Sequence, residues 1–165
     1  MMLEGWCMKT QEIELAVALH FGYRKNVIVP NVSWGMGLRY EADMVILRPS
    51  DYAIEVEIKI SAGDIVADTR KAVQHSSNLF RELWFALPEK LANHLAIPER
   101  AGILSVREHR GKPVVVVTRK SKINKSALKW TSKQRCKLME LGLMRIWKLK
   151  KKLSTYVLND VHPAT

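Results

Sequence analysis

The sequence predicts an α/β fold of the α+β type, in which a mixed sheet is flanked by helices. The first observation is Tyr52–Ser61, where apolar and polar residues alternate with the period of a strand. The second is Tyr40–Arg48, an apolar run that ends at the polar turn 49–51, so the two runs form a hairpin. The third is the pair of helical patterns on either side of these strands, Thr10–Tyr23 before them and 62–78 after them.

The elements before the hairpin are a helix and a strand. Thr10–Tyr23 carries acidic residues in its first turn and an apolar stripe, with Thr10 as the expected N-cap and Gly22 as the expected stop. Asn26–Trp34 reads as the first strand of a three-stranded meander. Pro30 has no N–H to give to a neighbouring strand, so it places this strand at an edge or at a bulge.

The elements after the hairpin extend the sheet. The helix over 62–78 leads to Arg81–Pro88, a short apolar run that we expect to be a strand. A helical crossover of this kind makes the strands on either side of it parallel. A short helix over Glu89–Ala96 and two further strands, Ala101–Glu108 and Pro113–Thr118, complete the expected order.

The polar face of Tyr52–Ser61 carries the residues with the clearest chemistry. Glu55, Glu57 and Lys59 share this face, and Asp43 interrupts the apolar run of the preceding strand. The alternative to a functional site is a solvated strand face with ordinary cross-strand ion pairs. Clustered carboxylates are costly unless a cation neutralises them. An Asp and a Glu from adjacent strands are suitable ligands for Mg²⁺, and a lysine beside them is suited to orient an attacking water.

Asp43 followed by Glu57-Ile58-Lys59 resembles the signature of the PD-(D/E)XK nuclease superfamily, which has the restriction-endonuclease-like fold. Further phrases strengthen the resemblance: V-P-N-V-S-W-G, E-A-D, E-V-E-I-K-I-S, L-W-F-A-L-P and I-P-E-R-A-G-I-L. Together they are similar to small, mostly uncharacterised bacterial and phage members, some described as DNA-repair-like, over roughly Thr10–Val117. The chain departs from the signature at Ala42, where the family name has Pro.

The resemblance implies a core of helix, meander, helix and strand, and a site that binds Mg²⁺ or Mn²⁺. Asp43, Glu57 and Lys59 would be catalytic. The metal ligands would be Asp43, Glu57, the Ile58 carbonyl and, from the first helix, Glu12, with Glu14 as the second candidate. For Glu12 and Glu14, the alternative is that they only favour the start of the helix. The residues expected to support the site are Glu14, Glu55, Lys71 and His75. The alternative for Glu55 is an ordinary ion pair, and the alternative for His75 is a structural role.

The positive charge is concentrated near the C-terminus. Residues 119–152 contain 13 Lys or Arg and one acidic residue, Glu140, whereas the whole chain carries a net charge of +11. We therefore divide the chain into a nuclease-like domain, 1–118, and a basic, helical extension, 119–165. The charge predicts a polyanionic partner such as DNA. A solvated helix face or an acidic protein partner is the alternative. The expected nucleic-acid contacts are Lys120, Lys122, Lys125, Lys129, Lys133, Arg135 and Lys137.

Composition narrows the setting. Cys7 and Cys136 have no metal-type spacing, which favours a reducing compartment such as the cytoplasm. Because no apolar run is long enough, we expect neither a signal peptide nor a membrane span. The leading hypothesis is a metal-dependent nuclease acting on DNA in repair, recombination or phage DNA processing. The alternatives are a catalytically silent nucleic-acid-binding module and an interaction protein with a basic helix. A homodimer is left open.

Overall fold

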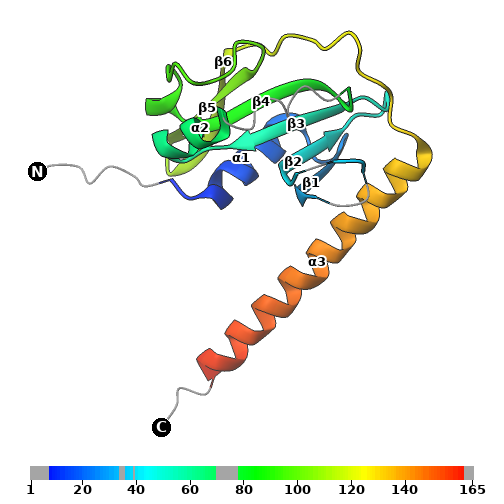
Figure 1. Ribbon diagram of the computed structural model, residues 1–165. Helices are drawn as coiled ribbons and strands as arrows, with labels where there is room; N and C mark the ends of the chain where they lie inside the picture. The colour runs from blue at the N-terminus through cyan, green and yellow to red at the C-terminus, as the bar shows by residue number, and fades with distance from the viewer. Residues whose placement is uncertain (1–7, 34–35, 39, 70–77, 162–165) are drawn as a thin grey trace, which may run out of the picture.

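The computed structural model describes residues 8–33, 36–38, 40–69 and 78–161 (Figure 1). Six strands form one sheet whose spatial order is the order of the sequence. The strands are β1 (Val27–Val32), β2 (Ala42–Leu47), β3 (Ala53–Ile58), β4 (Phe80–Pro88), β5 (Gly102–His109) and β6 (Lys112–Arg119). The predicted mixed sheet flanked by helices is confirmed.

The pairing pattern follows from the connections. β1, β2 and β3 form an antiparallel meander, β4 is parallel to β3, and β5 is parallel to β4 and antiparallel to β6. The predicted parallel pairing across the helical crossover is therefore confirmed. Pro30 lies in β1, at the edge of the sheet, where its missing N–H costs no ladder bond on the open side.

Helix α1 (Thr10–Phe21) covers one face of the sheet (Figure 1). Ile13, Ala16 and Val17 are its buried residues, and they share a core with alternate residues of the central strands. The N-cap of this helix is Lys9, one residue earlier than the predicted Thr10. Its end at Gly22, with φ of 74°, is as predicted, because glycine adopts this left-handed conformation without strain.

The opposite face of the sheet holds shorter elements. Helix α2 (Ala62–Thr69) buries Ile65 against a core cluster that includes Phe85 of β4. The helix predicted over Glu89–Ala96 is a single 3₁₀ turn, Glu89–Leu91, followed by further turns. These turns bury Ala92 and Ile97. A continuous helix is therefore not needed to place these two side chains in the core.

The alternative of a solvated face on β3 is excluded. Glu55, Glu57 and Lys59 are only 0, 4 and 8% exposed, and all six residues of β3 are buried. β3 lies between β2 and β4, so both of its edges are paired, and the burial of all its side chains shows that both of its faces are covered. A strand in this position normally reads as a continuous apolar run. The alternation in β3 therefore places charge inside the protein.

A connector, residues 120–131, runs from β6 to the last helix. Its backbone N–H groups donate in turn to the carbonyl oxygens of Arg100, Arg81, Asn78 and Asp51. Arg100 lies just before β5, Asn78 and Arg81 lie at the start of β4, and Asp51 lies just before β3. The connector therefore crosses the amino-terminal ends of these three strands. The basic extension is thus bound to the sheet from its first residues.

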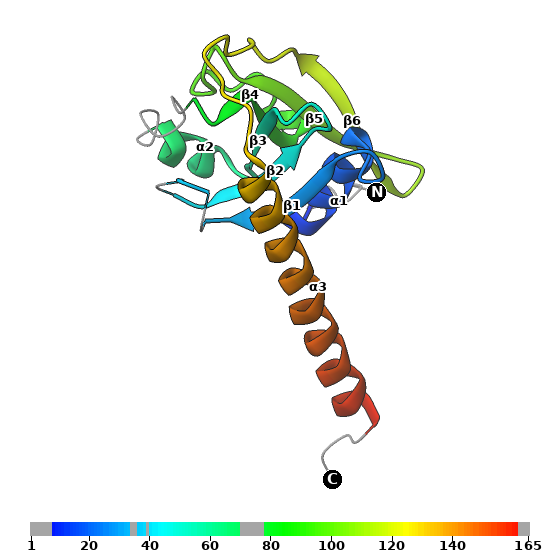
Figure 2. The same cartoon turned by 90° about the vertical axis from the view of Figure 1, so that its right-hand side faces the viewer.

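Helix α3 (Ser132–Val161) is one continuous helix of 30 residues. Thr131 and Gln134 exchange hydrogen bonds at its start in a capping box. Leu138 is fully buried, and α3 passes so close to β1 that a Cβ on Gly142 would lie 3.2 Å from a Val29 methyl. Gly142 therefore permits the close contact with β1, and the helix does not break there. Beyond this contact, α3 projects away from the domain (Figures 1 and 2).

Gly102→Ala tests the course of the connector. A Cβ at this position would meet the Trp84 ring and lie 2.7 Å from the Ser121 backbone nitrogen in the connector. We expect a loss of about 3 kcal/mol or more in the free energy of unfolding, because backbone and a packed indole ring cannot yield cheaply. Gly63→Ala is the matched control, since its Cβ would make only ordinary contact, at 3.7 Å, with the Ser61 hydroxyl just before α2. Chemical denaturation of both variants measures the difference, and an equal effect would contradict this packing.

Candidate active site

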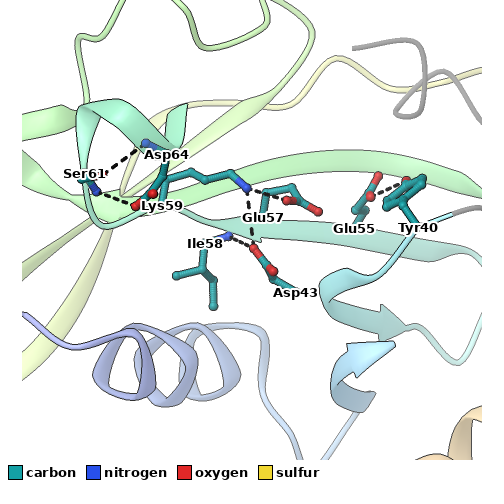
Figure 3. A network of polar contacts seen from close by, with 8 residues as sticks. All are labelled: Tyr40, Asp43, Glu55, Glu57, Ile58, Lys59, Ser61 and Asp64. Atoms are coloured by element: carbon teal, nitrogen blue, oxygen red, sulfur yellow. Dashed lines mark hydrogen bonds and ion pairs between the residues drawn. The ribbon is translucent and has the colours of Figure 1, made fainter. Parts of the chain in front are cut away.

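The three residues predicted to be catalytic meet at the carboxyl-terminal end of β3 (Figure 3). In the register of β2 and β3, Met44 pairs with Val56, so Asp43 and Glu57 are the next residues on the two strands. The Lys59 Nζ lies 2.7 Å from Glu57 Oε2 and 3.8 Å from Asp43 Oδ2. Both carboxylates thus lie on the same side of the sheet, within reach of one ammonium group.

Ile58 fixes one of these carboxylates. Its backbone N–H donates to Asp43 Oδ2 at 2.8 Å, which ties β2 to β3 at the site itself (Figure 3). The resemblance implied that the Ile58 carbonyl is a metal ligand. The contact that the structure provides is made by the N–H group, and it orients the Asp43 carboxylate.

The two carboxylates differ in their surroundings. The Asp43 side chain is 36% exposed, whereas that of Glu57 is 5% exposed. Burial, followed by the charge of Asp43, raises the pKa of Glu57 from 4.5 to about 7, although Lys59 opposes the shift. Glu57 Oε1 has no hydrogen-bond partner among the described residues. The site therefore pairs an accessible acid with a buried acid that has one oxygen uncommitted.

The first helix contributes Glu14 more directly than Glu12. The pKa of Glu14 is raised by burial and by the negative charge of Asp43, which places the two carboxyl groups within electrostatic range. The Glu12 carboxylate instead accepts a hydrogen bond from the Lys9 backbone N–H at 2.7 Å. This bond is part of the capping of α1, whereas the charge of Asp43 acts on Glu14, so Glu14, the second candidate, is favoured for the role at the site.

A buried pair lies beside the site. The Tyr40 hydroxyl donates to Glu55, which is fully buried, and the charge of Glu55 also raises the pKa of Glu57. Burial and Glu55 raise the pKa of Tyr40 as well. Tyr40 was not among the predicted site residues, although it stands three residues before Asp43 in the same predicted strand. Lys71 and His75 lie outside the described residues.

The described residues do not form a complete metal cage. No three His, Cys, Asp or Glu side chains within them are grouped closely enough to hold an ion. Between Asp43 and Glu57, the positive charge is supplied by Lys59. The free oxygen of Glu57 and the accessible carboxylate of Asp43 are nevertheless the hard ligands that Mg²⁺ or Mn²⁺ takes, with water completing the shell. The donor set fits a divalent ion held by two carboxylates.

The basic residues predicted to bind nucleic acid lie at the other end of the sheet. Lys120, Lys122, Lys125 and Lys129 belong to the connector, which crosses the amino-terminal ends of the strands. Several of the seven are engaged within the protein: Lys122 pairs with Glu99, Lys129 lies 5.7 Å from the Tyr52 ring centre, Arg135 binds Asp51 at 2.6 Å and Lys137 pairs with Glu140. Lys133 lies in the first turn of α3.

A second basic group lies on the side of the site. Arg145 donates to the Asn31 carbonyl oxygen at the end of β1, and β1 runs in the same direction as β3. Beyond Arg145, α3 continues with exposed lysines that are outside the predicted set: Lys148, Lys150, Lys151 and Lys152. The helix therefore leaves the domain from the end of the sheet at which β3 also ends.

Comparisons with known proteins identify the fold alone. No protein-family model matches the chain, and no curated protein matches it. A solved structure described as "SPO1766 protein of unknown function from Silicibacter pomeroyi" is similar, with a TM-score of 0.62 and 18% identity. The match covers 89% of this chain and 92% of that one. Within the described ranges, none of the helices is both long enough and apolar enough to cross a membrane.

Glu57→Gln tests the buried acid through stability. The pKa of Glu57 is raised in the folded protein, so the native state holds a proton that the unfolded chain releases as the pH rises from 4.5 to about 7. The contribution of Glu57 to the free energy of unfolding is therefore greatest below pH 4.5, and it falls as the pH rises to about 7. We expect Glu57→Gln to melt several degrees above the wild type at pH 8, with little difference at pH 4.5.

Glu108→Gln is the control for this comparison. Glu108 lies in the exposed end of β5 and accepts a hydrogen bond from the Gly111 N–H, which a glutamine oxygen can also accept. Thermal melts of both variants across pH isolate the effect of burial. Parallel stability profiles for the wild type and Glu57→Gln would show that Glu57 does not carry the raised pKa.

Proposed function

We propose that this protein is a metal-dependent nuclease that hydrolyses phosphodiester bonds in DNA and acts in the cytoplasm. The observation that carries the proposal is the convergence of Asp43, Glu57 and Lys59 from two adjacent strands on one point. Two carboxylates and an amine in this arrangement have the chemistry that phosphodiester hydrolysis needs. The resemblance to the PD-(D/E)XK superfamily rests on these same residues.

Each residue has a distinct role in the proposed reaction. Asp43 and Glu57 would hold a divalent ion, which supplies positive charge that makes bound water acidic and offsets charge on the phosphate. The Ile58 N–H keeps the Asp43 carboxylate in position. Lys59, once released from its contact with Glu57, would donate to the attacking water or to a phosphate oxygen. Glu14 adds negative charge next to Asp43.

Access to the site supports a large substrate. Asp43 opens to solvent, whereas Glu57 and Lys59 lie deeper. A phosphodiester backbone would thus meet Asp43 first, while the exposed lysines of α3 lie on the same side of the domain. Phosphate contacts of this kind give affinity that does not depend on sequence and that falls with salt.

Cleavage of plasmid, single-stranded and branched DNA with Mg²⁺ or Mn²⁺ tests the activity. We expect Asp43→Asn and Lys59→Ala each to reduce the rate at least roughly 100-fold, because each removes a group that acts on the reacting atoms. The amide oxygen introduced by Asp43→Asn would still accept the hydrogen bond from Ile58, so the fold is preserved. Glu99→Gln is the matched control, since this exposed carboxylate lies at the opposite end of the sheet. Unchanged cleavage in Asp43→Asn would reject the proposed mechanism.

The position of Lys59 favours a second candidate, a nucleic-acid-binding module without turnover. The lysine already pairs with both carboxylates and offsets part of their charge, as it would in a site that needs no metal. In that case DNA binding is indifferent to EDTA and to Asp43→Asn, and no cleavage is detected. Titration calorimetry with Mn²⁺ separates the two candidates, because only the nuclease requires the ion to bind at Asp43 and Glu57. If a protein partner stays bound after nuclease treatment, the result would instead favour the hypothesis of an interaction protein.

Two triple variants compare the basic groups in DNA binding. We expect Lys148→Ala/Lys151→Ala/Lys152→Ala to weaken binding and to reduce the slope of log K against log salt by about 2 to 3, as three phosphate contacts are lost. Lys120→Ala/Lys122→Ala/Lys125→Ala removes the same charge at the far end of the sheet and should change the slope less. Fluorescence anisotropy over a salt series measures both. The reverse order would show that the connector is the DNA-binding surface.

A further inference from the structure

The projecting part of α3 exposes a stripe of large apolar side chains. Six of them are between 49 and 67% exposed although they lie on an ordered helix: Met139, Leu143, Ile146, Trp147, Leu149 and Leu153. The side of α3 that faces the domain is a different one, formed by Leu138, Leu141 and Arg145, which pack on or bind to β1 and its surroundings. The stripe is therefore left uncovered by the described part of the domain.

The spacing of the stripe is that of a helix that packs against another helix. Met139, Leu143, Ile146, residue 150 and Leu153 follow one another at steps of four, three, four and three. This is the heptad repeat of apolar a and d positions, with a period of 3.5 residues. These five positions form the seam, and Lys150 is its one polar residue. A single lysine at an a position can determine how helices pair.

The charges of α3 are arranged so that two copies do not repel along this seam. Lys148, Lys151 and Lys152 occupy the f, b and c positions, which point away from a partner helix. The positions that flank the seam carry Trp147 and Leu149, so the apolar contact is widened on both sides. A basic helix with this distribution can therefore meet a second copy of itself.

The position of Lys150 decides between possible partners. Its ammonium lies in the middle of the stripe, 5.0 Å from the Trp147 ring centre. A lipid layer would have to accept this charge at the centre of the buried face. Parallel pairing of two copies would place the two Lys150 side chains directly opposite each other, because a positions face each other in that arrangement. Antiparallel pairing places a against d and opposes Lys150 to Ile146.

We propose that two copies of this protein associate through antiparallel pairing of the α3 stripe. Leu143 of one copy then packs against Leu153 of the other, and Ile146 packs against the stem of Lys150. The approximate two-fold axis crosses the helix pair at the level of Lys148, so the Trp147 and Leu149 side chains of both copies gather at the centre. This inference does not depend on the proposed nuclease activity.

Sedimentation equilibrium of the full-length protein tests the association. We expect a concentration-dependent dimer in the wild type and a monomer in Leu143→Lys/Ile146→Lys, whose fold should be intact since both side chains are exposed. The variant Lys148→Ala/Lys151→Ala/Lys152→Ala changes only outward positions and should remain dimeric. Lys150→Leu should tighten the dimer at least roughly tenfold, since it replaces the one charged residue of the seam. A wild type that is monomeric from micromolar to submillimolar concentration would overturn the proposal.

Cysteine cross-linking tests the orientation. With Cys7 and Cys136 replaced by Ser, oxidation of a mixture of Leu143→Cys and Leu153→Cys proteins should give the mixed disulfide, while each variant alone should give little. Efficient self-cross-linking of each variant would indicate parallel pairing and reject the proposed arrangement. Flotation with vesicles of phosphatidylcholine and phosphatidylglycerol covers the lipid alternative: a monomer that floats only with the anionic vesicles would show that the stripe binds membranes instead.

Discussion

The contact of Lys59 with Glu57 is the interaction on which the rest of the site depends. Both side chains are almost fully buried in the centre of the sheet, where an isolated charge is costly to desolvate. Their ion pair at 2.7 Å reduces that cost without removing it, and the raised pKa of Glu57 records what remains. A domain selected for stability alone would place apolar residues at these positions. The charged interior is therefore the feature on which the proposed function rests.

The sheet topology explains why the acids come together. β2 and β3 are joined by a tight turn, so Asp43 and Glu57 face each other on neighbouring strands at the end that lies away from the turn. The parallel strand β4 then closes the other edge of β3 and accepts the Lys59 backbone N–H at the Ala86 carbonyl. The short backbone segment that carries Glu57 and Lys59 is thus held from both sides, and its side chains are directed to Asp43.

Much of this arrangement could be predicted from the sequence, because it rests on local periodicity. The alternation of β3, the turn before it and Pro30 at the sheet edge each have a local cause. The burial of β3 has no such local cause, because its pattern is that of a half-exposed strand and the elements that cover both of its faces are distant in the sequence. The same limit applies to the two tryptophans of the basic segment. Trp130 is 3% and Trp147 is 67% exposed, although both stand among lysines.

The site residues divide in the same way. Asp43, Glu57 and Lys59 follow from strand register and could be predicted, whereas the choice between Glu12 and Glu14 depends on how α1 is rotated against the sheet. Glu12 is used for capping at Lys9, which leaves Glu14 as the acid in electrostatic range of Asp43. The course of the connector could not be predicted, since its bonds to the strand ends join residues far apart in the sequence.

The clamp between Arg135 and the β2–β3 turn has a mechanical consequence. Arg135 binds both the Asp51 carboxylate and the Arg48 carbonyl oxygen, so the first turn of α3 is fixed to the loop from which the two acid-bearing strands depart. Between this clamp and its free end, α3 is also held on β1, where Arg145 binds the Asn31 carbonyl oxygen. A force applied to the free end would therefore act first on β1 and, through the pairing of β1 with β2, on the strand that carries Asp43.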